Sequence, residues 1–100
     1  MTIEAKREGN KLFLKVAGRV DNSTASQFEK EIQDRLDEDV TEVLMDFSML
    51  YYISSAGLRV LLMAQKTMNK RDGKMVIRNA NSVVRETFHI TGFLKVLTVE

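Results

Sequence analysis

The sequence predicts an α/β fold: a small mixed β-sheet with packed helices, in the order β-β-α-β-α-β-α-β. First, short strand-like segments alternate with three amphipathic helical segments along most of the chain. Second, the turn signal Gly9-Asn10 joins the first two strands into a hairpin. Third, the chain has 100 residues, 44% of them hydrophobic, and no proline or Gly/Ser linker divides it. We therefore expect a single domain over residues 1–100, with parallel pairing between the strands that helices separate.

The N-terminal hairpin is expected over residues 2–8 and 11–18. Its second strand alternates, so that one face is apolar and the other is mixed. The apolar face consists of Leu12, Leu14 and Val16. A sheet built on this strand is therefore half-buried, with its apolar face toward the core.

The first helix is expected to start after Asn22, Ser23 and Thr24, all of which are good N-cap residues. Its apolar positions are spaced by three and four residues. They are Ala25, Phe28, Ile32 and Leu36. The acidic run Asp37-Glu38-Asp39 opposes the helix dipole at this end, so we expect the helix to fray there.

The second strand-to-helix unit begins with the apolar run Val43-Leu44-Met45, which Asp46 closes. A loop over residues 48–53 is expected to lead to Ser54-Ser55 and a helix over residues 56–70, which Asp72-Gly73 stops. The loop carries Met49, Leu50, Tyr51 and Tyr52. Two interpretations stay open: the loop is exposed as a protein interface, or it folds back over the sheet.

The last part of the chain repeats the pattern. Residues 75–77 form a short buried strand, and Asn79 or Asn81-Ser82 caps a third helix that Thr91-Gly92 ends. Residues 96–99 form a final strand.

Composition excludes several function classes. The formal net charge is +1, which gives no electrostatic reason to expect a nucleic acid partner. With no cysteine and a single histidine, we expect no metal site, and with dispersed glycines no phosphate cradle or cofactor. No signal peptide or membrane span is evident, so we expect a cytoplasmic protein without direct membrane insertion.

An enzyme is the alternative that the serines raise. Ser54-Ser55-Ala56-Gly57 at a helix start, followed by Asp72 and His89, has the serine–acid–histidine order of some hydrolases. The glycine two residues before either serine is missing, and 100 residues are few for that fold. We therefore expect no catalytic residues and no enzymatic activity.

Ser55 is the residue of most chemical interest. At a helix start the backbone N–H groups and the dipole favour an anion, so a phosphate on Ser55 would be tolerated and would add nearly two negative charges. The simpler interpretation is that Ser55 only caps the helix. The residue pattern alone leaves both interpretations open, a phosphate acceptor and a simple helix cap. The same two interpretations apply to Ser54.

Three motifs in the chain are informative together. The central one runs from Val43-Leu44-Met45-Asp46-Phe47-Ser48 through Tyr52-Ile53-Ser54-Ser55-Ala56-Gly57-Leu58-Arg59-Val60-Leu61-Leu62. The others are Leu14-Lys15-Val16-Ala17-Gly18-Arg19-Val20-Asp21 and Thr91-Gly92-Phe93-Leu94-Lys95-Val96-Leu97. Together they resemble the STAS domain family, in order and spacing, over essentially the whole chain. The stand-alone bacterial members of this family are anti-sigma factor antagonists.

The resemblance implies a partner switch. An unphosphorylated antagonist binds an anti-sigma factor that is also a serine kinase, which frees the sigma factor. The kinase phosphorylates the motif serine and ends the complex, and a PP2C-type phosphatase resets it. Counting back from Gly57-Leu58, the phosphoacceptor maps onto Ser55, or less well onto Ser54. The partner-binding positions map onto Asp21, Asn22, Asp46, Ser54, Ser55, Gly57, Leu58 and Arg59.

The sequence departs from the family pattern in two places. Ser54 stands where many members have an aspartate before the acceptor. The further helix that many members carry after the last strand is expected to be absent or to lie outside these 100 residues. The alternative function within the family is a STAS scaffold or accessory subunit of a transport or sensory complex, which binds a partner without phosphorylation.

Overall fold

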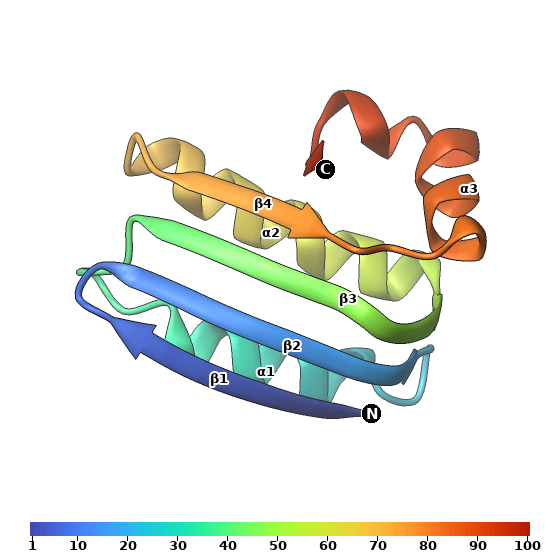
Figure 1. The fold of residues 1–100 in the computed structure, drawn as a ribbon, viewed down its shortest axis with the longest axis horizontal. Helices are drawn as coiled ribbons and strands as arrows, with labels where there is room; N and C mark the ends of the chain where they lie inside the picture. The colour runs from blue at the N-terminus through green and yellow to red at the C-terminus, as the bar shows by residue number, and fades with distance from the viewer.

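The computed structural model describes residues 1–100 and contains one five-stranded sheet in the order β1-β2-β3-β4-β5. Figure 1 shows β1 to β4 side by side in this order. The strands and helices follow one another in the predicted order. They are β1 (Thr2–Glu8), β2 (Lys11–Val20), α1 (Ala25–Arg35), β3 (Glu42–Ile53), α2 (Ser55–Lys70), β4 (Lys74–Arg78), α3 (Ser82–Thr91), the 3₁₀ turn η1 (Phe93–Lys95) and β5 (Thr98–Val99).

The sheet is mixed. β1 pairs antiparallel with β2, and all other neighbours are parallel. α1 and α2 lie behind the sheet on one face (Figure 1), as right-handed crossovers between successive parallel strands require. The predicted apolar face of β2 points toward them, and Leu12, Leu14 and Val16 are buried. The opposite face of these strands is not covered by α1 or α2.

The predicted loop over residues 48–53 is wrong, because β3 continues to Ile53. Two register shifts interrupt its pairing with β2, between Lys15 and Ala17 and between Gly18 and Arg19. Such bulges break the alternation of buried and exposed residues that identifies a strand in a sequence. Within this segment Leu50 is fully buried, whereas Met49, Tyr51 and Tyr52 are exposed.

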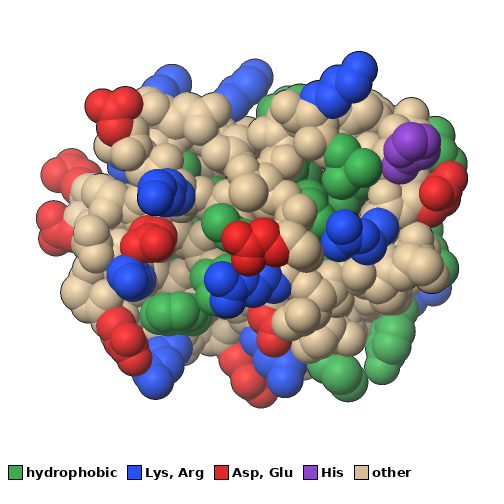
Figure 2. Space-filling model, turned by 45° about the horizontal axis from the view of Figure 1, so that its top comes forward, with side chains coloured by type: hydrophobic (Ala, Val, Ile, Leu, Met, Phe, Trp, Pro, Cys, Tyr) green, Lys and Arg blue, Asp and Glu red, His purple; other side chains and the backbone are tan.

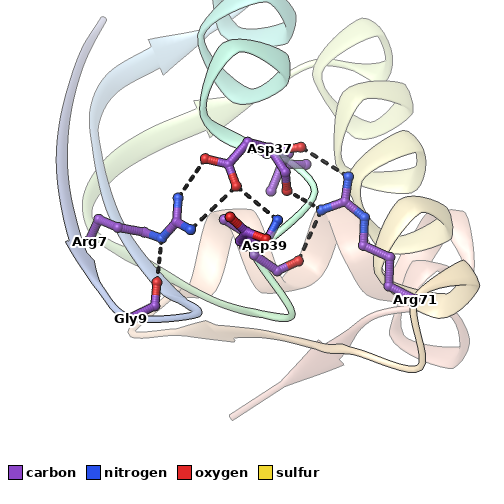
Figure 3. A network of polar contacts seen from close by, with 7 residues as sticks. Arg7, Gly9, Asp37, Asp39 and Arg71 are labelled. Atoms are coloured by element: carbon purple, nitrogen blue, oxygen red, sulfur yellow. Dashed lines mark hydrogen bonds and ion pairs between the residues drawn. The ribbon is translucent and has the colours of Figure 1, made fainter.

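The acidic run that follows α1, where fraying is expected, makes contacts with two distant segments of the chain. Asp37 pairs with Arg7 of β1 at 2.7 Å, and Arg71 after α2 donates to the backbone oxygens of Leu36, Asp37 and Val40 (Figure 3). Arginine side chains from two distant segments thus supply the cations and donors that the acidic run lacks locally. The network anchors the α1–β3 connection.

The C-terminal segment differs in detail from the expectation. The last strand comprises only Thr98–Val99, because η1 carries the chain from α3 to β5. Gly92 ends α3 with a positive φ of 78°, in agreement with the predicted stop. α3 lies beyond the ends of β3 and β4 (Figure 1), and Asn81 at its start donates to the carbonyl of Leu50.

Candidate functional site

The candidate site lies where the parallel strands β2 and β3 end together. Val20 and Ile53 are paired in register, and the Ser54 N–H donates to the Val20 carbonyl at 2.8 Å. Asp21 and Ser54, the residues that follow the two strands, are therefore neighbours at one edge of the sheet. This is the edge at which open α/β sheets place their ligands.

The two serines have different environments. Ser54 is the N-cap of α2: it is buried, with 7% of its surface exposed, and its Oγ accepts a hydrogen bond from the Gly57 N–H at 3.2 Å. Ser55 is the first helical residue and is exposed. The interpretation of Ser55 as the cap is therefore wrong, and its hydroxyl is accessible. The predicted helix start at Ala56 moves to Ser55.

Gly57 and Leu58 hold the first turn of α2 against the sheet. A Cβ added at Gly57 would meet side-chain atoms of Val20 and Ile53 at 2.7 Å, so no larger residue fits without displacement. Leu58 is 2% exposed and belongs to the core. Both residues position the serines rather than present a surface.

Asp21 organises the turn between β2 and α1. Its Oδ1 accepts hydrogen bonds from the backbone N–H and the hydroxyl of Ser23 and from the backbone N–H of Thr24. These bonds, led by the Ser23 hydroxyl, hold the pKa of Asp21 below its usual value. Thr24 is the N-cap of α1 but makes no side-chain cap bond, so Asp21 supplies what Asn22, Ser23 and Thr24 were expected to supply.

A groove between the first turns of α1 and α2 brings two predicted site residues together. Asn22 and Ser26 line it from the α1 side, and Ala56 and Arg59 from the α2 side. Arg59 is exposed and lies four residues after Ser55. On a helix this spacing places the two side chains on the same face, about 5–6 Å apart at Cβ.

Asp46 lies apart from this group. Because β3 extends to Ile53, Asp46 is within the strand and not at its end, opposite Lys15 and Arg78 in the sheet. Its Oδ1 accepts from the backbone N–H of Ser48 at 2.9 Å and from the Asn79 side chain at 3.1 Å. The Ser48 N–H bond is the main reason why its pKa is lowered.

The end of β3 adds a feature that sequence reasoning missed. The Arg19 guanidinium lies over the ring of Tyr52, 4.7 Å from its centroid, and Tyr51 beside it is 58% exposed. Only the strand register reveals this pair, because Arg19 and Tyr52 are opposite each other across β2 and β3. Exposed tyrosine and arginine are the residue types that protein interfaces favour.

The serine–acid–histidine arrangement is not assembled. Asp72 follows the far end of α2, which rises about 24 Å over its 16 residues. His89 is on the surface of α3. Neither side chain hydrogen-bonds to Ser54 or Ser55. The site instead offers an exposed hydroxyl at a positively polarised helix start.

None of the helices combines the length and the apolar character needed to cross a bilayer. The described residues also contain no cluster of three or more histidine, cysteine or carboxylate side chains arranged to hold a metal ion.

Comparisons with known proteins agree with this architecture. Residues 3–98 match the family model described as Mlab, STAS domain. The chain is 39% identical over 82 residues to the putative anti-sigma factor antagonist BtrV of Bordetella bronchiseptica, covering 82% of this chain and 71% of BtrV.

Two solved structures share the fold. The anti-sigma factor antagonist SpoIIAA in its unphosphorylated form superposes with a TM-score of 0.84 at 17% identity, covering 99% of this chain and 88% of that one. The Bacillus cell fate determinant SpoIIAA in its phosphorylated form superposes with a TM-score of 0.76 at 16% identity, covering 99% and 91%.

Proposed function

Because this chain belongs to the STAS domain family, we propose that it is an anti-sigma factor antagonist whose partner binding is controlled by phosphorylation of Ser55. In the unphosphorylated state it binds an anti-sigma factor of the serine-kinase class in the cytoplasm and so frees a sigma factor. Phosphorylation by that kinase ends the complex, and a PP2C-type phosphatase restores it. The protein itself carries out no reaction.

The observation that carries the proposal is the contrast between the two serines. A kinase needs a hydroxyl that it can reach, and Ser55 is exposed whereas Ser54 is buried as the helix cap. The similarity to BtrV and to SpoIIAA, which has been solved in phosphorylated and unphosphorylated forms, supports the same class of control.

The fold would accept a phosphate at Ser55. The N–H groups of the first turn of α2 point toward this end of the helix, and the dipole favours an anion there. Arg59, on the same helix face, adds a positive charge. We therefore expect the phosphate to change the surface and to leave the packing of Gly57 and Leu58 unchanged.

The effect on a partner would be large. The Ser55 hydroxyl is neutral, and a phosphate on it adds nearly two negative charges to the surface. If the partner packs against the neutral hydroxyl, desolvation and repulsion of a few kcal/mol lower the affinity by about 100-fold or more. The partner surface would comprise Asp21, Asn22, Ser55 and Arg59, with the buried Ser54, Gly57 and Leu58 supporting its shape. Asp46, which lies within β3 and apart from these residues, would not belong to it.

Affinity purification from the native host tests this function. Tagged wild type and Ser55→Ala should retain an anti-sigma factor with a kinase domain, and Ser55→Asp should lose it. Ser82→Asp is a matched control, because Ser82 is likewise the exposed first residue of a helix after a capping side chain, here Asn81. Equal recovery with all four proteins would contradict the switch and favour a constitutive STAS scaffold.

A further inference from the structure

The face of the sheet that α1 and α2 leave uncovered carries an ordered pattern, which Figure 2 shows as acidic and basic side chains alternating around hydrophobic ones. We call this surface the open face. Strand register arranges it in three rows that run across the sheet. The first row is Glu8, Lys11, Glu42 and Lys74; the second is Lys6, Phe13, Leu44 and Val76; the third is Glu4, Lys15, Asp46 and Arg78.

The middle row is apolar at its centre. Phe13, Leu44 and Val76 are only half-buried, and shallow hollows on either side of Phe13 are lined by both apolar and charged residues. A contiguous apolar strip rimmed by charge is typical of a surface that another protein covers. The sheet itself provides no element to cover it.

The outer rows alternate in sign from strand to strand. Within one molecule this pattern already gives cross-strand attraction, as the 3.7 Å pair between Lys11 and Glu42 illustrates. Both rows run in the same sense: acidic on β1, basic on β2, acidic on β3 and basic on β4. If β1 is superimposed on β4, and β2 on β3, every charge in these two rows therefore meets a charge of the opposite sign.

That superposition is what a two-fold axis along the strands, midway between β2 and β3, produces with a second copy. We propose that the open face binds a second copy of this chain face to face about this axis. Lys11 then lies opposite Glu42 of the other copy, and Lys15 opposite Asp46. Phe13 packs against Leu44 of the other copy, and each contact occurs twice because the interface is isologous.

The charges select this axis over the other in-plane two-fold axis. An axis across the strands would place the first row over the third on the same strand. Lys11 would then face Lys15 and Glu42 would face Asp46, so that every opposed pair would be of like charge. Like charges placed opposite each other across an interface cost several kcal/mol.

Sheet geometry limits how tight the dimer is. Aligned sheets cross at about 30°, which displaces the outer strands more than the central ones. The contacts of β2 and β3 near the axis therefore dominate. Four strands spaced about 4.8 Å apart over about five residues give a small interface, so we expect a weak dimer at the low end of the range of specific complexes. α1, α2 and Ser55 remain free, and the proposal does not depend on phosphorylation.

Paired charge reversals provide a test that a folding defect cannot imitate. Lys11→Glu alone places two carboxylates opposite each other across the interface, and Glu42→Lys alone places two ammonium groups there. Each variant should therefore dimerise about 100-fold more weakly than the wild type. Mixed together, the two variants form a heterodimer in which the two reversed side chains attract each other and the two unchanged ones do the same. Sedimentation velocity over a concentration series up to millimolar should show wild-type dimers, monomeric single variants and dimers restored in the mixture.

Lys66→Glu on the exposed side of α2 is the control, and it should dimerise as the wild type does. A wild type that stays monomeric at millimolar concentration would overturn the proposal. Dimers that persist in both single variants would place the interface elsewhere, for instance at Ile90 on α3, which is 73% exposed. A mixture that stays monomeric would rule out the proposed axis.

Discussion

The hydroxyl of Ser54 accepts a hydrogen bond from the backbone N–H of Gly57 at 3.2 Å. This bond makes Ser54 the cap of α2 and turns its side chain into the protein. Ser55, the next residue, is thereby left exposed at the helix start. Two chemically identical side chains thus have separable roles, one in stability and one in the proposed regulation.

Replacing Ser54 by alanine should destabilise the protein. The Gly57 N–H loses its partner, and the loss of an N-cap costs about 1 kcal/mol. Ser55→Ala is the matched control and should change the free energy of unfolding by less than about 0.5 kcal/mol. Urea unfolding of both variants measures the difference. Equal stabilities would show that the cap bond contributes nothing.

Gly57→Ala should be destabilising even though alanine is the better helix former. The added methyl would meet Val20 and Ile53 side-chain atoms at 2.7 Å, and such overpacking costs about 1–3 kcal/mol. Alanine gains at most about 1 kcal/mol over glycine in helix propensity, so the cost of overpacking should outweigh this gain. Urea unfolding, with the exposed Ser26→Ala of α1 as control, checks the sign. A stabilised Gly57→Ala variant would contradict the close packing.

Arg71→Lys should weaken the junction between α1 and β3. Arg71 donates from both terminal nitrogens to the carbonyls of Leu36, Asp37 and Val40, and a single ammonium cannot reproduce this fork. We expect a loss of about 1–3 kcal/mol in unfolding free energy. The neighbouring exposed Lys70→Arg should have little effect. A fully stable Arg71→Lys protein would mean that the network in Figure 3 is dispensable.

Stability should fall in acid. The pKa of Asp37 is lowered by its bond to Arg7, that of Asp21 by the Ser23 hydroxyl, and that of Asp46 by the Ser48 N–H. A lowered folded-state pKa means that each carboxylate stabilises the fold above the ordinary value of 3.8 and loses this contribution as the pH falls through the folded-state pKa. Urea midpoints should therefore begin to drop below about pH 5 and should fall most steeply below the ordinary value of 3.8. Asp37→Asn should reduce the drop, and an unchanged drop would contradict the Arg7–Asp37 pairing.

Local patterns explain why most of the fold was predictable. The spacing of Phe28 and Ile32 identifies α1, and the alternation of Leu12 and Leu14 identifies β2, because burial on one face imposes a period on the sequence. The second half of β3 escaped prediction because its bulges shift the register against β2 and erase that period. The contacts at the end of α1 escaped prediction because Arg71, which donates hydrogen bonds there, lies more than thirty positions away in the sequence.

The site was predictable only in part. Strand order places Asp21 beside Ser54, because adjacent parallel strands end at the same edge. Sequence could not decide which serine caps α2, since both are good cap residues and helix ends are uncertain by one or two positions. The stacking of Arg19 on Tyr52 depends on side-chain placement across two strands, which no local pattern encodes.

The central claim is that Ser55, and not Ser54, carries the phosphate. Intact-mass and phosphopeptide analysis of the protein from its native host tests it, with Ser55→Ala and Ser54→Ala expressed in the same way. We predict one added phosphate on the wild type and on Ser54→Ala, located at Ser55, and none on Ser55→Ala. Phosphate that persists in Ser55→Ala, or its absence from the wild type under every growth condition, would contradict the claim.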